Sequence, residues 1–344
     1  MTPTSPTPTR GLDAETRKSL SESLTQLFAD STTGDEVTAS LTEMGWAEVE
    51  AEDTAAATSL LFRAQGAALA STTALSDTMI RSFEADLPYA ASKVTLALPH
   101  PSDDAARPGA QHTSRTRAIL LDRPLTDTLV LLPTCHGDRV VLRAVAAEWV
   151  LDRCTSVRGF DPAPTWLLLD TPDEPPVVAE PVVVDWVSAI GLGRRALAAE
   201  ILGVCDAALD LAREHVAARH QYGRAIGSFQ AVRHRLSEAF VAVESATAVL
   251  DASWNDVVGE GSLDTPPEWA SVVAKARAGR AQSEVMRTGV QVLGAMGLTL
   301  ESTMHRHVTR AAALDLLLGG EARLETALGD ALLTGTPAYP FASI

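Results

Sequence analysis

The stretch R-H-Q-Y-G-R-A-I-G-S-F-Q, Arg219–Gln230, lies between two long alanine-rich segments whose composition is typical of helices. A glycine-containing turn between helices is ordinary, but this one is flanked by an arginine and a glutamine. The planar guanidinium of Arg219 could bind a pyrophosphate through strong bidentate hydrogen bonds. Alternatively, Arg219 could be a solvated side chain that complements the negative end of a helix dipole.

The helices around this turn are predicted from apolar spacing. Apolar residues recur at intervals of mostly three and four from Ile226 to Leu250, which predicts one helix that ends near V-V-G-E-G-S at 257–262. The next helix is predicted to start at D-T-P-P-E-W, with Asp264 or Thr265 as N-cap, and to run through V-V-A-K-A-R-A-G.

Further helices are predicted from near Glu301 and after Gly320, so that the C-terminal region forms an antiparallel bundle of four or more helices. The region from Gly11 to Leu87 is also helical in pattern. Between them, short β-rich runs are broken by Pro, Gly and Asp. T-L-V-L-L-P, C-H-G-D and R-V-V-L-R-A-V predict a hairpin, while W-L-L-L-D and P-V-V-V-D-W predict further strands.

The sequence therefore predicts an α+β, mainly helical fold. Its expected parts are a disordered tail (1–10), an N-terminal helical domain (11–87), a middle β domain (88–185) and a C-terminal antiparallel four-helix bundle (186–344).

Composition excludes several functional classes. The formal charge of -16 argues against a nucleic-acid partner. The cysteines, Cys135, Cys154 and Cys205, are odd in number and widely spaced, which favours neither a disulfide framework nor a zinc site. His305 and His307 have no third ligand nearby in the sequence, so no metal is predicted. The chain lacks an apolar run of about 18 residues and a signal-peptide pattern, so we expect a cytoplasmic protein without a membrane span.

A second motif, Q-V-L-G-A-M-G, covers Gln291–Gly297. Its small residues would let a phosphate or another chain approach the backbone closely. A glycine C-cap that ends the preceding helix is the simpler alternative.

Together these features resemble the acyl-CoA dehydrogenase family, which has the same helical, β, helical order and binds FAD between subunits. The resemblance rests on R-H-Q-Y-G-R-A-I-G-S-F-Q, V-A-K-A-R-A-G and Q-V-L-G-A-M-G-L-T-L-E followed by R-H-V-T-R. It is specific over roughly residues 187–320, loose over the β domain and faint before it.

The resemblance implies roles for particular residues. Arg219, Gln230 and Tyr222 would reach the ADP half of a FAD held largely by the neighbouring subunit. Gln291 and Gly294 match the segment that lies against the adenine and pyrophosphate of the flavin. Arg194 matches an arginine near the CoA moiety, although the adjacent Arg195 makes that alignment ambiguous.

The same comparison leaves the catalytic base unassigned. Oxidation of an acyl-CoA needs a carboxylate that removes the α-proton. The two positions that supply this base in relatives fall on Gly320 and Gly193, and Glu321 lies one residue after the first. The T-E-P segment that lines the flavin ring in relatives appears here as L-P-H-P-S-D-D.

These departures favour one version of the resemblance: the shorter subunit of an actinobacterial heterotetramer that acts on steroid side-chain CoA thioesters, in which a longer homologue supplies the base. A self-sufficient homo-oligomer that uses Glu321 as a displaced base is a second hypothesis. A flavin-free structural or regulatory subunit is a third, and a different flavin chemistry on the same fold a fourth.

Overall fold

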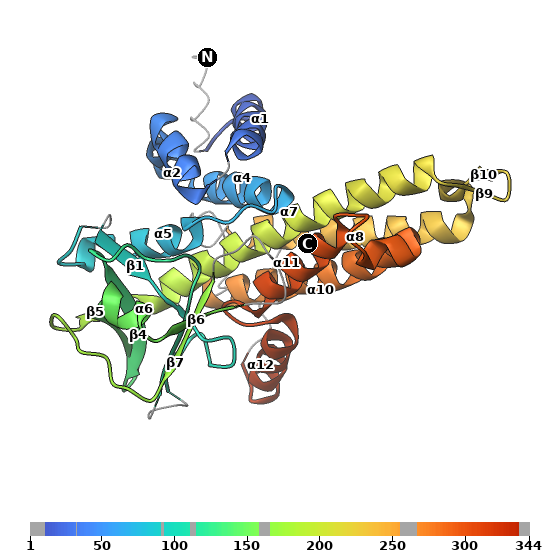
Figure 1. Ribbon diagram of the computed structural model, residues 1–344. Coiled ribbons are helices and arrows are strands. Elements are labelled where there is room, and N and C mark those ends of the chain that lie inside the picture. Colours follow the sequence, from blue (N-terminus) through green and yellow to red (C-terminus); the bar gives the residue numbers. More distant parts are fainter. Residues whose placement is uncertain are drawn as a thin grey trace, which may run out of the picture.

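The computed structural model describes residues 11–31, 33–90, 93–110, 115–157, 166–254 and 267–336. Its elements follow the predicted order of helices, strands and helices, and the predicted fold class is confirmed (Figure 1). The predicted disordered tail and the predicted N-cap residues Asp264 and Thr265 lie outside the described residues.

The N-terminal region is a set of helices tied together by side-chain caps. Its elements are α1 (Ala14–Asp30), α2 (Gly34–Glu43), α3 (Trp46–Glu52), α4 (Thr54–Ala67), α5 (Ala74–Arg81) and the 3₁₀ helix η1 (Glu84–Asp86). The Asp53 carboxylate caps α4 by accepting from the Ala56 N–H at 2.9 Å. It also accepts from Arg17 Nη2 at 2.8 Å, so the same side chain fixes α1 against α4.

Two four-stranded sheets follow, in the orders β1-β4-β5-β8 and β2-β3-β7-β6. Their strands are β1 (Val94–Leu96), β2 (Leu98–Pro99), β3 (Thr116–Leu120), β4 (Leu129–His136), β5 (Arg139–Ala146), β6 (Cys154–Ser156), β7 (Leu167–Thr171) and β8 (Val182–Val183), with the short helix α6 (Ala147–Leu151) after β5. The predicted hairpin is β4 and β5, which pair from Leu129↔Ala146 to His136↔Arg139. Gly137 has φ 63° in its two-residue turn, where glycine is favoured.

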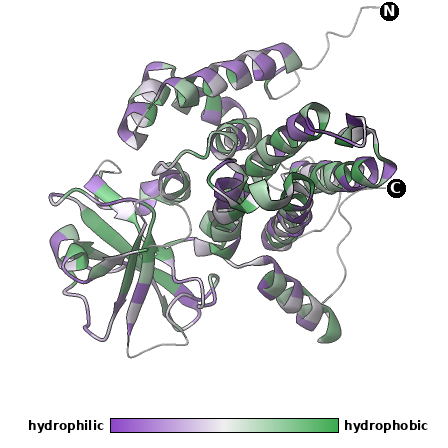
Figure 2. Ribbon diagram, turned by 45° about the vertical axis from the view of Figure 1, so that its right-hand side comes forward, coloured by the Kyte–Doolittle hydropathy of each residue, from purple (hydrophilic) through white to green (hydrophobic). Residues whose placement is uncertain are grey.

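The interior of this sandwich follows the two-residue period of its strands. Alternate strand residues from both sheets, together with residues of α6 and Ala97 between β1 and β2, form a small separate core: Ala97, Ala118, Leu120, Val130, Leu132, Val145, Ala147, Val150, Leu167 and Leu169. The intervening Ile119, Leu131 and Leu142 belong instead to the large core shared with the helices. Green hydrophobic residues accordingly dominate the strands in Figure 2.

The C-terminal bundle consists of α7 (Trp186–Ala218), α8 (Gln230–Ala252), α10 (Pro267–Leu293) and α11 (Met304–Leu316), with the short 3₁₀ helices η3 (Ile226–Ser228) and η4 (Gly294–Leu298) and a final helix α12 (Glu321–Leu333). Arg195 near the start of α7 donates to the Ser253 carbonyl just after α8, at 2.7 Å. Lys275 near the start of α10 donates to the Asp315 carbonyl near the end of α11, at 2.9 Å. Successive helices therefore run antiparallel, as predicted.

Three predicted boundaries are wrong in detail. The run P-V-V-V-D-W is strand only at Val182–Val183, because Asp185 caps α7 by accepting from the Ser188 N–H and Trp186 already starts that helix. Residues 226–228 form a 3₁₀ turn, so α8 starts at Gln230 and not at Ile226. The helix expected near Glu301 starts at Met304.

The N-terminal region packs on the bundle through two glycines. A Cβ at Gly66 in α4 would collide with the Glu200 carbonyl of α7, and a Cβ at Gly203 in α7 would collide with the Arg63 carbonyl of α4. Only glycines let the two helix backbones come this close. Helix α7 packs against α5 of the N-terminal region as well as against the bundle helices. Since these contacts cross the predicted boundaries, the three-domain division at residues 88 and 186 stays a proposal.

Candidate functional site

The Arg219–Gln230 segment folds as a small hairpin at the end of the bundle farthest from the β sheets (Figure 1). Strands β9 (His220–Gln221) and β10 (Arg224–Ala225) pair antiparallel across Tyr222 and Gly223, whose φ angles are 53° and 78°. Two successive positive φ values are the requirement of a type I′ turn. The sequence thus specifies a hairpin in which Arg219 and Gln230 stand at the two helix ends.

Aromatic contacts stiffen this hairpin. The Arg224 guanidinium lies 4.1 Å from the ring centre of Phe229, and the Tyr222 ring meets the same Phe229 ring edge-on at 6.3 Å. Tyr222 itself is 93% exposed. The hairpin is therefore ordered by its own contacts while it presents a large aromatic side chain to its surroundings.

Arg219 presents its side chain to solvent at the end of α7. Its backbone caps α7 by donating to the His215 carbonyl at 2.9 Å. Within the described ranges its exposed guanidinium makes no hydrogen bond or ion pair. The pKa of His215 is lowered first by the partial burial of its own imidazole and then by the positive charge of Arg219. The five N–H donors of Arg219 are thus available to a ligand or another chain.

Gln291 and Gly294 lie at the same end of the bundle. Arg277 of α10 donates to the Ser245 hydroxyl of α8 at 2.7 Å, which fixes the register of these antiparallel helices. At a rise of 1.5 Å per residue, Gln230 on α8 and Gln291 on α10 each lie roughly 22 Å along their helix from that contact. The two helices are antiparallel, so both residues lie in the same direction from it. Both are exposed, and Gly294 has φ 63° with nothing within 4 Å of an added Cβ. The structure therefore groups both sequence motifs at one end.

The two base positions lie far from this end. Gly193 and Arg219 are separated by about 26 residues of α7, or roughly 39 Å. A Cβ at Gly193 would lie 2.6 Å from Leu318 Cδ1 and 2.7 Å from Met79 Sδ, so apolar side chains already occupy the space of a side chain there. Gly320 is the N-cap of α12, next to the Asp315 carboxylate.

Glu321 is the carboxylate nearest to these positions in sequence, and it is engaged. Its side chain is 18% exposed and accepts from Arg280 Nη1 at 3.3 Å. Its backbone N–H donates to the Asp315 carboxylate, 3.2 Å from either oxygen. Lys275, which is fully buried, holds Asp315 in turn, and burial lowers the pKa of its ammonium. This arrangement fixes the loop between α11 and α12.

Arg194 is buried, contrary to what a solvent-accessible CoA contact would need. Its Nε donates to the Leu318 carbonyl at 3.1 Å, and burial lowers its pKa to about 10. Arg195 is equally enclosed and lies over the Trp254 ring at 5.1 Å. Both candidates of the ambiguous alignment thus serve the packing of the bundle in this structure.

A buried ion pair was missed by the sequence reasoning. Arg310 Nη1 lies 3.7 Å from Glu200 Oε1, and both side chains are almost completely buried. Arg310 also donates to the Leu69 and Ala70 carbonyls at 3.0 and 2.7 Å. Burial raises the pKa of Glu200 to about 7, although the positive charge of Arg310 acts to lower it. The sequence feature that could have predicted such buried pairs is a charged residue inside an otherwise apolar stretch, such as Glu200 in α7 or Lys275 in α10.

Comparison with known proteins identifies the C-terminal bundle. Residues 186–333 match the model of the acyl-CoA dehydrogenase C-terminal domain. Over these residues the chain resembles the acyl-CoA dehydrogenase family. The matching range contains the hairpin, the end of α10 and both base positions.

Several acyl-CoA dehydrogenases are similar over part of their length. Acyl-CoA dehydrogenase IpdE2 from Mycobacterium tuberculosis is 28% identical over 214 residues, which are 60% of this chain and 61% of that protein. IpdE2 from Mycolicibacterium smegmatis is 35% identical over 36% of this chain and 37% of its own length. The match therefore spans less than two thirds of either relative.

Solved structures share the complete acyl-CoA dehydrogenase fold. A chain of the ChsE4–ChsE5 complex from Mycobacterium tuberculosis aligns with a TM-score of 0.72 at 19% identity, over 95% of this chain and 99% of that one. A chain of the Tcur3481–Tcur3483 steroid ACAD variant aligns with a TM-score of 0.70 at 22% identity, over 94% and 99%.

Within the described residues no cluster of three or more His, Cys, Asp and Glu side chains could hold a metal ion. In that same part of the chain, no helix has both the length and the apolar character needed to cross a bilayer. The cysteines carry free thiols, with Cys205 buried.

Proposed function

We propose that this chain is the base-lacking subunit of a heteromeric, FAD-dependent acyl-CoA dehydrogenase that desaturates an acyl-CoA thioester in the cytoplasm. The observation that carries the proposal is the filled position at Gly193. Leu318 and Met79 occupy the space that a carboxylate side chain at this position would need, and the second base position is also a glycine, Gly320. A longer homologous partner would supply the base.

The reaction divides its tasks between the protein and its cofactor. A carboxylate must remove the α-proton of the thioester, and the flavin, when bound, accepts the β-hydride. Hydrogen-bond donors must also stabilise the charge that develops on the thioester carbonyl. Of these groups, this chain offers donors for the cofactor and not the base.

The exposed residues at the hairpin end fit the ADP half of FAD. The free guanidinium of Arg219 would bind the pyrophosphate, and Gln230, Gln291 and Tyr222 would line its approach. The open backbone at Gly294 would allow close contact. Because roughly 39 Å of helix separates Arg219 from Gly193, these residues would serve a site on a neighbouring subunit.

The β domain fits the isoalloxazine half less well. The segment that replaces T-E-P is held internally, since Arg117 donates to the Ser102 hydroxyl at 2.8 Å and to Asp103 at 3.1 Å. His100 is likewise 2.8 Å from the same guanidinium. These side chains are committed to one another, so a complete flavin site within this chain is not supported.

The solved relatives support a heteromeric partner. Both the ChsE4–ChsE5 and the Tcur3481–Tcur3483 structures pair two differently named proteins, and the latter is described as a steroid ACAD. By analogy, we propose a steroid or related lipid acyl-CoA as substrate and a longer acyl-CoA dehydrogenase as partner. Spectroscopy of the chain with and without that partner tests the proposal.

Replacement of Glu321 separates the main alternative from the proposal. In the complex with the longer homologue, Glu321→Gln should leave turnover within about twofold, because the carboxylate is committed to a surface ion pair with Arg280. Steady-state turnover of an acyl-CoA measures the effect. Glu325→Gln, on the exposed face of the same helix, is the matched control. Loss of turnover with flavin retained would instead identify Glu321 as the base.

A further inference from the structure

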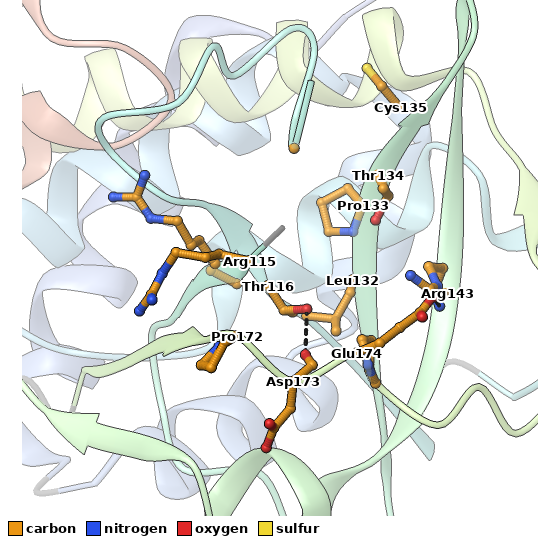
Figure 3. Close-up of a pocket in the computed structure, with 14 residues that line it drawn as sticks. Arg115, Thr116, Leu132, Pro133, Thr134, Cys135, Arg143, Pro172, Asp173 and Glu174 are labelled. Atoms are coloured by element: carbon orange, nitrogen blue, oxygen red, sulfur yellow. Dashed lines mark hydrogen bonds and ion pairs between the residues drawn. The ribbon is translucent and has the colours of Figure 1, made fainter. Parts of the chain in front are cut away.

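The open end of the β sandwich contains a cavity of about 430 Å³ (Figure 3). Its floor is apolar and is formed by Ala118 and Leu132, which belong to the core between the sheets. Its walls are polar: three arginines, Arg115, Arg117 and Arg143, enter from both sheets. A cavity of this size can take a small organic ligand.

The arginines of the two sheets approach the cavity from different sides. Figure 3 shows Arg115 beside β3 and Arg143 across the cavity on β5. Between them the Thr116 hydroxyl donates to the Asp173 carbonyl at 3.1 Å, which fixes the loop that follows β7. The cationic groups are thus spread around the opening, where they could contact more than one anionic group of a ligand.

Each arginine has a carboxylate partner but keeps unused donors. Arg115 Nε donates to Asp170 at 2.7 Å, which leaves most of its guanidinium N–H groups unengaged within the described residues. Arg117 is anchored on Asp103, yet its Nε is buried without a hydrogen-bond acceptor. A buried donor without an acceptor is costly and would be relieved by a bound oxyanion.

The ion pair between Arg143 and Glu174 is the one that a ligand can break most easily. Arg143 Nη2 donates to Glu174 Oε1 at 3.2 Å, but the Glu174 side chain is 83% exposed whereas that of Arg143 is only 23% exposed. Such a solvent-exposed carboxylate holds its partner weakly. The same two residues line an adjoining hollow of about 560 Å³, so displacement of Glu174 would free Arg143 for a ligand that extends into both spaces.

The lining carboxylates do not cancel this cationic character. Asp173 is neutralised from outside the cavity by Arg153, at 2.8 Å. Asp170 and Asp103, which pair with Arg115 and Arg117, lie outside the lining, so Glu174 is the lining carboxylate that holds a cavity arginine. In a chain of net charge -16, a cavity lined by three arginines is a local exception.

We propose that this cavity binds an anionic small molecule through its phosphate or carboxylate oxygens, with Glu174 as an internal competitor that the ligand displaces from Arg143. Arg115 and Arg143 would grip the oxyanions from opposite sheets, and Thr134 would line the path between them. None of the residues proposed for the ADP half of FAD lines this cavity.

Isothermal titration calorimetry with ADP, and separately with citrate, tests the proposal on the full chain carrying Arg219→Ala, which removes the ADP contact proposed at the hairpin. Arg143→Gln should weaken binding about tenfold, because it removes a charge-assisted contact. Glu174→Gln should strengthen binding about threefold, because it removes the competing carboxylate. Arg213→Gln, which alters an exposed arginine that pairs with Asp210 on α7, should leave affinity unchanged.

The two ligands distinguish the chemical source of the oxyanion. Tighter binding of ADP would indicate a phosphorylated ligand, and tighter binding of citrate a polycarboxylate. Absence of saturable binding of either ligand would overturn the proposal. Equal affinities of the chains with Arg143→Gln, with Glu174→Gln and with both native residues would also overturn it. Loss of folding cannot imitate the expected result, because it would weaken binding in both variants and could not strengthen it in Glu174→Gln.

Discussion

Arg219→Ala should lower the FAD affinity of the complex with the longer homologue about 100-fold. The exposed guanidinium has no hydrogen bond or ion pair within the described part of the chain, so its proposed partner is the cofactor on the neighbouring subunit. Two charge-assisted hydrogen bonds at about 1.5 kcal/mol each account for this magnitude. Flavin retained after gel filtration, measured by absorbance, gives the effect.

The matched control for this variant is Arg213→Ala. Arg213 lies on the same helix and is 76% exposed, but it pairs with Asp210 at 3.0 Å. Neither substitution should shift the melting temperature by more than a degree or two. Full flavin retention in Arg219→Ala would contradict the clamp and favour a flavin-free structural subunit.

Gly203→Ala should destabilise the chain by about 3 kcal/mol. The added Cβ would collide with the Arg63 carbonyl, which is backbone inside α4 and cannot rotate away. The two helices would have to separate, which exposes apolar surface and disturbs the Arg63–Asp206 contact at 3.3 Å. The small gain in helix propensity from alanine does not offset this cost. Thermal unfolding measured by circular dichroism should show a drop of several degrees.

Gly329→Ala in α12 is the control for Gly203→Ala. Nothing lies within 4 Å of a Cβ at Gly329, so the substitution should stabilise its helix by up to about 1 kcal/mol. Opposite signs for the same chemical change would show that backbone proximity, and not helix propensity, decides the outcome. Unchanged stability of Gly203→Ala would mean that α4 and α7 pack less closely than described.

Local patterns predicted much of this fold. The spacing of apolar residues predicted the bundle, and the alternation around C-H-G-D predicted the β4–β5 hairpin with its turn at Gly137. Errors arose where a short polar side chain redirected the backbone. Asp185 is such a case, because an N-cap and a strand end look alike until the first helical turn is known.

The candidate site was predictable in part. Arg219 and Gln230 stay predicted cofactor residues; their motif is continuous in sequence, and both lie exposed at one end of the bundle. The filled space at Gly193 could not be predicted, since Met79 and Leu318 reach it from distant parts of the chain. The Glu200–Arg310 pair was hidden for the same reason, because its partners are 110 residues apart.

The visible absorption spectrum tests the central claim most directly. The purified chain should show little flavin absorbance by itself, while the chain co-purified with a longer acyl-CoA dehydrogenase homologue should be yellow and should bleach when an acyl-CoA is added. Flavin bands in the single chain that bleach with an acyl-CoA would contradict the account, because they would require a complete site and a base within this subunit.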